Sequence, residues 1–151
     1  MTTALAVAGA LGFTILSQKY QEYKLQQLSY RMQLQEREVE LKKQKAQANT
    51  NTLAAKELLD NAKITLEKKK QHVTELKTQI AKAKANEDLA LQQQLEADLV
   101  VAEKEQVAAQ KEYNLARKTY AEEKYKELQI DNQITENMAA QRSTMGLMGG
   151  L

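Results

Sequence analysis

Few residues in this chain could do chemistry. It has one histidine, His72, and no cysteine, so thiolate metal sites and cysteine nucleophiles are excluded. No carboxylate cluster surrounds His72 at metal-ligand spacing, and no nucleophile is paired with a base and an orienting group. We interpret His72 as a surface or seam residue. We expect no catalytic, cofactor-binding or metal site, and predict that the chain is not an enzyme.

The basic residues do not form a nucleic-acid site either. Lys68–Lys70 is the densest basic run, but on a helix its side chains point in three directions, and stacking aromatics are not concentrated beside it. Residues 1–85 carry an excess of lysine and arginine and residues 86–151 an excess of acids, although the net charge is only +2. This asymmetry favours self-pairing or contacts between copies. The alternative is that both halves are simply solvated and that their charge imbalance is accidental. We expect no sequence-specific nucleic-acid binding.

The elements that position these residues are helices. Phe13 to Met145 contains neither glycine nor proline and is rich in Ala, Leu, Gln, Glu and Lys, which favour helix. Aromatic residues make up only 5% of the chain, which leaves little bulk for a globular core. The predicted fold is all-α: long helices or a helical hairpin, coiled-coil-like, assembling into an oligomeric bundle, ring or tube.

Residues 1–18 form a predicted apolar N-terminal helix without charged side chains. Ala4–Leu16 is apolar or small apart from Thr14, and its thirteen residues fall short of the ~20 that span a bilayer. No basic residue precedes this run, as one would in a secretory signal. A small and a bulky ridge run along this helix, formed by Ala4, Ala8 and Gly12 and by Val7, Leu11 and Ile15. These ridges favour membrane contact or close packing on other protein helices.

Residues 19–142 are predicted to be an amphipathic helical body, followed by a flexible Gly/Met tail at 143–151. A tyrosine-containing stripe in the first part of this body suits either helix contacts or a membrane boundary. Asn49–Thr52 and Asn86–Asp88 are the two expected break points, because short polar side chains favour caps and turns. At Asn49–Thr52 a continuous helix is the alternative.

Two heptad seams follow from the apolar spacing. Their candidate contact residues are Leu59, Leu66, Val73, Leu76 and Ile80 in the first and Leu95, Leu99, Tyr113 and Tyr120 in the second. If the chain reverses at Asn86–Asp88, facing residue numbers sum to about 172, which sets Lys68–Lys70 level with Glu103 and Glu105. This charge match favours a hairpin over a straight continuation. The second seam is rich in alanine and buries little area, so we expect a homo-oligomer.

The opening ALAVAGALGFTILSQKYQEYKLQQLSYRMQLQ, followed by a Gln/Ala-rich helical body and a Gly/Met end, resembles the small internal virion (DNA-ejection) proteins of short-tailed bacteriophages. The resemblance covers mainly residues 4–35. It implies packaging in the virion, release at infection, and assembly with other virion or envelope proteins into a channel across the host cell envelope.

The alternative function is a cellular coiled-coil stalk or scaffold with a membrane-associated N-terminal helix. The b subunit of ATP synthase is similar in outline, and a rod of a secretion apparatus is a further candidate. Such a protein would be membrane-associated in a bacterial cell. The uncharged N-terminal segment favours the virion protein over these stalks.

Overall fold

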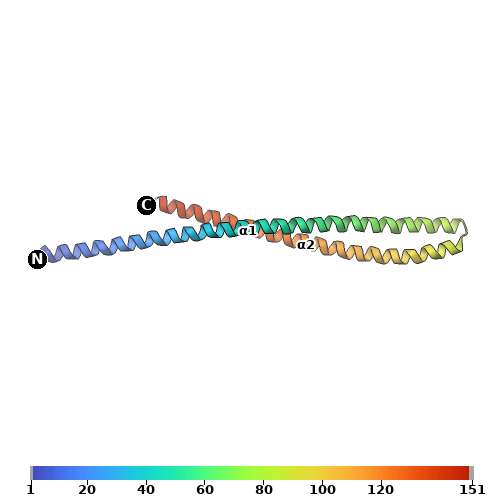
Figure 1. Ribbon diagram of the computed structural model, residues 1–151, viewed down its shortest axis with the longest axis horizontal. Helices are drawn as coiled ribbons and strands as arrows, with labels where there is room; N and C mark the ends of the chain where they lie inside the picture. Colours follow the sequence, from blue (N-terminus) through green and yellow to red (C-terminus); the bar gives the residue numbers. More distant parts are fainter. Residues whose placement is uncertain (1, 150–151) are drawn as a thin grey trace. The chain divides into compact units, whose positions relative to one another are not determined.

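The computed structural model describes residues 2–149, and side-chain exposure is described for residues 15–145. Two helices account for the described chain apart from a three-residue turn: α1, Thr2–Ala85, and α2, Leu89–Gly149 (Figure 1). No strand occurs between residues 2 and 149. The helices pack against each other as a hairpin, so the all-α helical hairpin predicted from the sequence is confirmed.

A short turn at Asn86–Asp88 reverses the chain. Glu87 lies in the left-handed region with φ of 55°. The Glu87 N–H donates to the Lys84 carbonyl (3.1 Å) and the Asp88 N–H to the Ala83 carbonyl (3.0 Å), the pair of bonds that defines a Schellman C-cap. A non-glycine residue in this conformation costs roughly 1–2 kcal/mol.

Asp88 begins α2. Its side-chain Oδ1 accepts the Leu91 N–H at 3.1 Å, and its carbonyl accepts the Gln92 N–H at 3.0 Å. These are the bonds of an N-cap. The sequence suggested Asn86 as the cap-type residue; the structure assigns that role to Asp88, because Asn86 still bonds back into α1 through its N–H to the Lys82 carbonyl.

The other expected break does not occur, because α1 runs through Asn49–Thr52. The polar side chains here bond along the helix instead of capping it. Thr50 Oγ1 donates to the Ala46 carbonyl at 3.1 Å, and Gln47 Nε2 donates to Asn51 Oδ1 at 3.0 Å. Each bond spans one helical turn, so these residues leave the helix intact. At the other end α2 continues to Gly149, so most of the predicted flexible tail is helical.

The contacts divide the chain into two compact units. One, here called the loop unit, is Ala46–Leu128. The other, here called the terminal unit, combines Met1–Lys45 with Gln129–Leu151. In each unit a stretch of α1 lies antiparallel to a stretch of α2.

The loop unit contains the hydrophobic core. Buried and partly buried positions alternate at three- and four-residue spacing on both helices, the heptad pattern of a coiled coil. The core cluster near the turn consists of Val73, Leu76, Ile80, Ala83, Leu95 and Ala102, with Leu99 packed against it. Farther from the turn small residues such as Ala48, Ala55 and Ala109 occupy the seam, so the helices bury less apolar area there.

The seam of the terminal unit is more polar. On α1 its partly buried positions include Gln27, Arg31 and Glu38, and on α2 Asn137 and Thr144 are buried. Leu34, Leu41, Ile130 and Ile134 supply apolar contacts between them. Less apolar burial makes this unit cheaper to open than the loop unit.

Candidate assembly surfaces

The predicted N-terminal contact residues lie mostly outside the described side chains. Ala4, Val7, Ala8, Leu11 and Gly12 belong to helical positions of α1 whose side chains are not described. Ile15, the last of the set, is exposed. Over the described residues, no helix has an apolar stretch of the length and hydropathy needed to cross a membrane.

Beyond Ile15, α1 exposes a series of large apolar side chains. The exposed set between residues 16 and 39 is Leu16, Tyr20, Tyr23, Leu25, Leu28, Tyr30, Met32 and Val39. The sequence suggested that the tyrosine stripe serves helix contacts or a membrane boundary. Within the hairpin the three tyrosines Tyr20, Tyr23 and Tyr30 are exposed, whereas Gln27 and Leu34 of the same stripe are partly buried. Lys24 lies over the Tyr20 ring, with Nζ 4.9 Å from the centroid, which keeps a charge beside an apolar ring.

The predicted seam residues lie on the α1–α2 contact. Leu66, Val73, Leu76, Ile80 and Leu95 are buried. Leu59, Leu99, Tyr113 and Tyr120 are partly buried. All nine belong to the loop unit, so the structure brings them together within one chain. They are therefore occupied by the hairpin, and contacts between copies must use other side chains.

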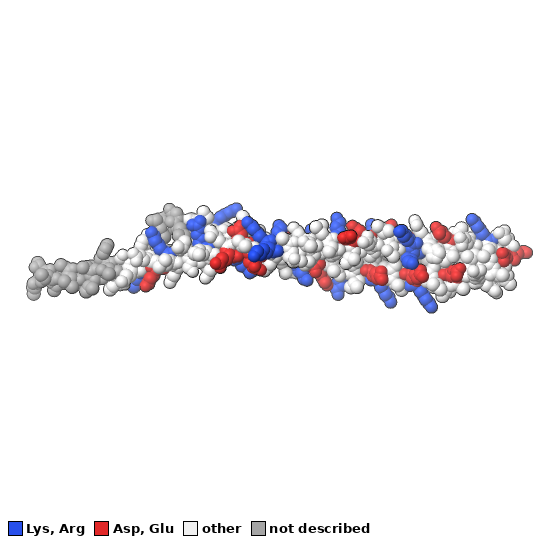
Figure 2. Space-filling view, in the orientation of Figure 1, with Lys and Arg blue, Asp and Glu red and all other residues white. Residues whose placement is uncertain are grey.

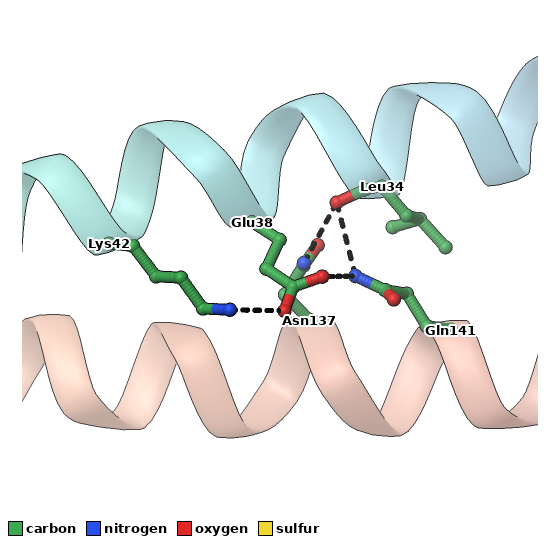
Figure 3. Close-up of polar contacts among 5 residues, drawn as sticks. All are labelled: Leu34, Glu38, Lys42, Asn137 and Gln141. Atoms are coloured by element: carbon green, nitrogen blue, oxygen red, sulfur yellow. Dashed lines mark hydrogen bonds and ion pairs between the residues drawn. The ribbon is translucent and has the colours of Figure 1, made fainter.

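A polar network links the two helices of the terminal unit (Figure 3). Asn137 Nδ2 donates to the Leu34 carbonyl at 2.9 Å, and Gln141 Nε2 donates to the same carbonyl at 3.3 Å. Gln141 Nε2 also lies 3.0 Å from Glu38 Oε2, and Lys42 Nζ lies 2.9 Å from Glu38 Oε1. The hydrogen bond from Gln141, followed by the interactions with Lys42, lowers the pKa of Glu38.

This network makes the helix contact specific. A buried amide in a coiled-coil seam is satisfied only when its partner is at the matching height, which disfavours other registers. Lys45 and Asp131 add a second link in the same unit, with 2.6 Å between Nζ and Oδ1. These groups hold the helices in register; none of them is placed as a base beside a nucleophile.

Lys69 and Glu105 form the corresponding cross-helix link in the loop unit. Lys69 Nζ lies 2.9 Å from Glu105 Oε2, and this hydrogen bond, followed by the charge of Lys69, lowers the pKa of Glu105. The sequence placed Lys68–Lys70 level with Glu103 and Glu105, and this contact confirms that match.

An apolar groove runs between the helices on one side of the loop unit. Its volume is about 260 Å³, and its lining residues are Ala55, Leu58, Ala62, Glu112, Leu115, Ala116 and Thr119. Leu58 and Leu115 flank the small residues and are 64% and 65% exposed. Large side chains beside alanines make both a projection and a recess, the shape that another helix can fill.

Sequence reasoning overlooked one feature outside the seams. Lysines recur at every seventh residue of α1 from Lys56 to Lys84, and acids recur at every seventh residue of α2 from Asp98 to Glu112. Attention to apolar periodicity alone hides this pattern, because all of these residues lie outside the contact stripe. A search for charges at heptad spacing finds it directly.

The described residues contain no group of three or more His, Cys, Asp or Glu side chains that could hold a metal ion. Their chemistry is that of surfaces: exposed apolar side chains, ordered charges and an apolar groove. No family model, curated protein or solved structure matches this chain.

Proposed function

We propose that this protein is a structural, channel-forming virion component that helps to deliver a phage genome across the host cell envelope. The observation that carries the proposal is the set of large apolar side chains that α1 leaves uncovered between Ile15 and Val39. A helix that exposes this many large apolar and aromatic side chains requires another surface to cover them. Tyrosines and leucines together are suited to a membrane boundary. Their three- and four-residue spacing is also suited to contacts with helices of neighbouring copies.

The difference between the two units supports a change of state at delivery. The terminal unit is held by polar contacts and few buried apolar residues, whereas the loop unit holds the apolar core. Separation of the helices in the terminal unit therefore costs less than in the loop unit. Opening would free α1 to meet a membrane or other virion and envelope proteins while the loop unit keeps copies together.

The resemblance of residues 4–35 to internal virion proteins supplies the biological setting: packaging in the particle, then location in the host envelope. The hairpin counts against a stalk of the ATP synthase b type, because such a stalk continues as one helix and this chain reverses at Asn86–Asp88. Many copies of a hairpin placed side by side would form the wall of a ring or tube.

Leakage of dye from liposomes tests the channel. The full chain should release dye, and deletion of residues 2–16 or the double variant Leu25→Gln/Leu28→Gln should reduce release strongly. Ile64→Gln/Tyr125→Gln is the matched control, because these two residues are exposed to a similar extent but lie in the loop unit. This control should leave release unchanged.

Two further measurements complete the test. Native mass spectrometry in detergent should show an assembly of at least hexameric size, and proteomics of purified particles before and after DNA ejection should show the protein lost with the genome. A stable monomer or dimer that releases no dye would overturn the proposal. A membrane-bound dimer would instead support the stalk or scaffold.

A further inference from the structure

One flank of α1 in the loop unit carries a row of exposed lysines. The row consists of Lys56, Lys63, Lys70, Lys77 and Lys84. Seven residues make two turns of a coiled-coil helix, so these side chains leave α1 on one side at intervals of about 10 Å. Within the described residues none of the five forms an ion pair.

A row of acids lies on α2 in the same unit. Asp98, Glu105 and Glu112 are exposed and also seven residues apart. Figure 2 shows acidic side chains following one another along the α2 side of the loop unit toward the turn. Glu105 pairs with Lys69, while Asp98 and Glu112 form no ion pair in the described part of the chain.

The two rows lie on opposite faces of the hairpin. Leu58 directly precedes the seam residue Leu59, and it lines a groove together with Glu112. Asp98, Glu105 and Glu112 likewise directly precede partly buried seam residues of α2. Leu58 and these three acids therefore share one face, here called the acidic face. The lysines directly follow seam positions such as Ala55 and Leu76, and so leave α1 on the other side of the seam. That side is here called the lysine face.

The two rows also lie at the same heights along the hairpin. The contact between Lys69 and Glu105 places Lys70 level with Glu105, to within about one residue rise of ~1.5 Å. Because the helices are antiparallel and both rows repeat every seven residues, Lys77 is level with Asp98. By the same step, Lys63 is level with Glu112.

We infer that the lysine face of one copy docks on the acidic face of a second copy of this chain. Lys77 then pairs with Asp98 of the next copy, and Lys63 pairs with Glu112 of the next copy. The inference rests on the self-assembly in the proposed function and identifies the contact that makes it.

Apolar side chains on both faces support the same arrangement. Leu58 and Leu115 project from the acidic face, and Val100 and Val107, which follow seam positions of α2, are exposed on the lysine face. Face-to-face docking covers both sets in every copy except at the ends of an open row. Charge complementarity sets the register, and apolar burial adds affinity.

This contact limits the geometry of the assembly. It joins two different faces, so it is heterologous and each copy has one neighbour on either side. The paired charges lie at equal heights, so successive copies have no axial displacement. Repetition gives a ring with helices parallel to its axis if each contact also rotates the next copy, and an open row of parallel hairpins if it does not.

A polyanion on the lysine face is the competing occupant. It would use the lysines, but would leave the acidic row and the groove beside Leu58 uncovered. The matched second row in the same chain favours a second copy.

Charge reversal in the full chain tests the contact by sedimentation velocity. One double variant, Lys63→Glu/Lys77→Glu, makes both faces acidic. The other, Asp98→Lys/Glu112→Lys, makes both faces basic. Each variant alone should raise the concentration at which half of the copies are assembled by at least about tenfold, because like charges then meet. An equimolar mixture should restore assembly, with an even number of alternating copies by native mass spectrometry.

The matched control is Lys111→Glu/Lys118→Glu. It makes the same charge change at the same seven-residue spacing, but on the side of α2 away from the seam. It should assemble like the unmodified chain. Circular dichroism of every variant monitors the helices, and restoration in the mixture shows directly that each variant is folded.

The outcomes separate the contact from the proposed function. If the unmodified chain assembles and releases dye but the reversed variants do so equally well, the docking faces are wrong and the channel stands. If the mixture fails to restore assembly, or nuclease treatment dissolves the unmodified assembly, the second-copy contact is overturned in favour of other contacts or a bridging polyanion. If the unmodified chain never assembles, both proposals fail.

Discussion

Substitution of Thr52 by valine should stabilise the hairpin. Thr52 is 7% exposed, and its Oγ1 is buried without a hydrogen-bond partner among the described residues. A buried, unsatisfied polar group costs about 1–3 kcal/mol. Valine has the same shape without the hydroxyl, and the helix propensities of the two residues are nearly equal. The expected gain in the free energy of unfolding is therefore about 1–2 kcal/mol.

Urea unfolding followed by circular dichroism at 222 nm, a wavelength that reports helix, measures this gain. In a thermal unfolding experiment on a chain of this size, the midpoint temperature should rise by about 2–4 °C for each kcal/mol gained. The matched control is Thr144→Val. Thr144 is also buried in the hairpin, but its Oγ1 donates to the Ala140 carbonyl at 2.9 Å, so removal of that hydroxyl frees no unsatisfied group. If Thr52→Val is neutral or destabilising, or if both variants gain equally, the unsatisfied hydroxyl is not a source of instability.

Three other predictions concern the turn, the core and acid. Glu87→Gly should raise the free energy of unfolding by about 1 kcal/mol, because glycine adopts the left-handed conformation without strain; no gain in urea unfolding would contradict this. Leu76→Ala should lower the free energy of unfolding by about 2–5 kcal/mol, because it leaves a cavity in the core. Leu89→Ala, at an exposed site, should change it by less than about 0.5 kcal/mol. Equal losses in the two variants would contradict the assigned core. The pKa values of Glu38 and Glu105 are lowered in the folded chain, so their contribution is present above the ordinary glutamate pKa of about 4.3 and is lost as the pH falls through the folded values. The double variant Glu38→Gln/Glu105→Gln should therefore lose less stability between neutral and acid pH than the unmodified chain, and an equal loss in urea unfolding would contradict the roles of these carboxylates.

Much of the fold follows from local chemistry. Absence of glycine and proline between Phe13 and Met145, together with strong helix formers, is enough to predict long helices, because helix propensity and i,i+4 contacts act within one turn. The heptad spacing of Leu66, Val73 and Ile80 likewise marks a seam before any partner is known. Opposite charge excess in the two halves favoured a hairpin, and Lys69 with Glu105 shows the same match in the structure.

Other features depended on tertiary packing. Asn49–Thr52 has the composition of a turn, yet α1 continues, because its polar side chains bond within the helix while α2 covers Ala48 and Thr52. Asp88 rather than Asn86 caps α2, because the Schellman turn occupies Asn86 and Glu87, and α2 therefore starts two residues later than the cap signal suggested.

The sequence alone also left open which stripe of residues 15–39 would meet α2. Tyr20, Gln27, Leu34 and Leu41 follow one another at seven-residue spacing on one side of α1, and the hairpin covers this stripe from Gln27 onward while Tyr20 stays exposed. Across the seam Asn137 and Gln141 bond to the Leu34 carbonyl and to Glu38, and on the other side of α1 Leu25, Leu28, Met32 and Val39 stay exposed. Composition and periodicity therefore determine that helices form and which faces are apolar. Only the three-dimensional register decides which of those faces the chain covers itself and which it leaves for a membrane or another copy.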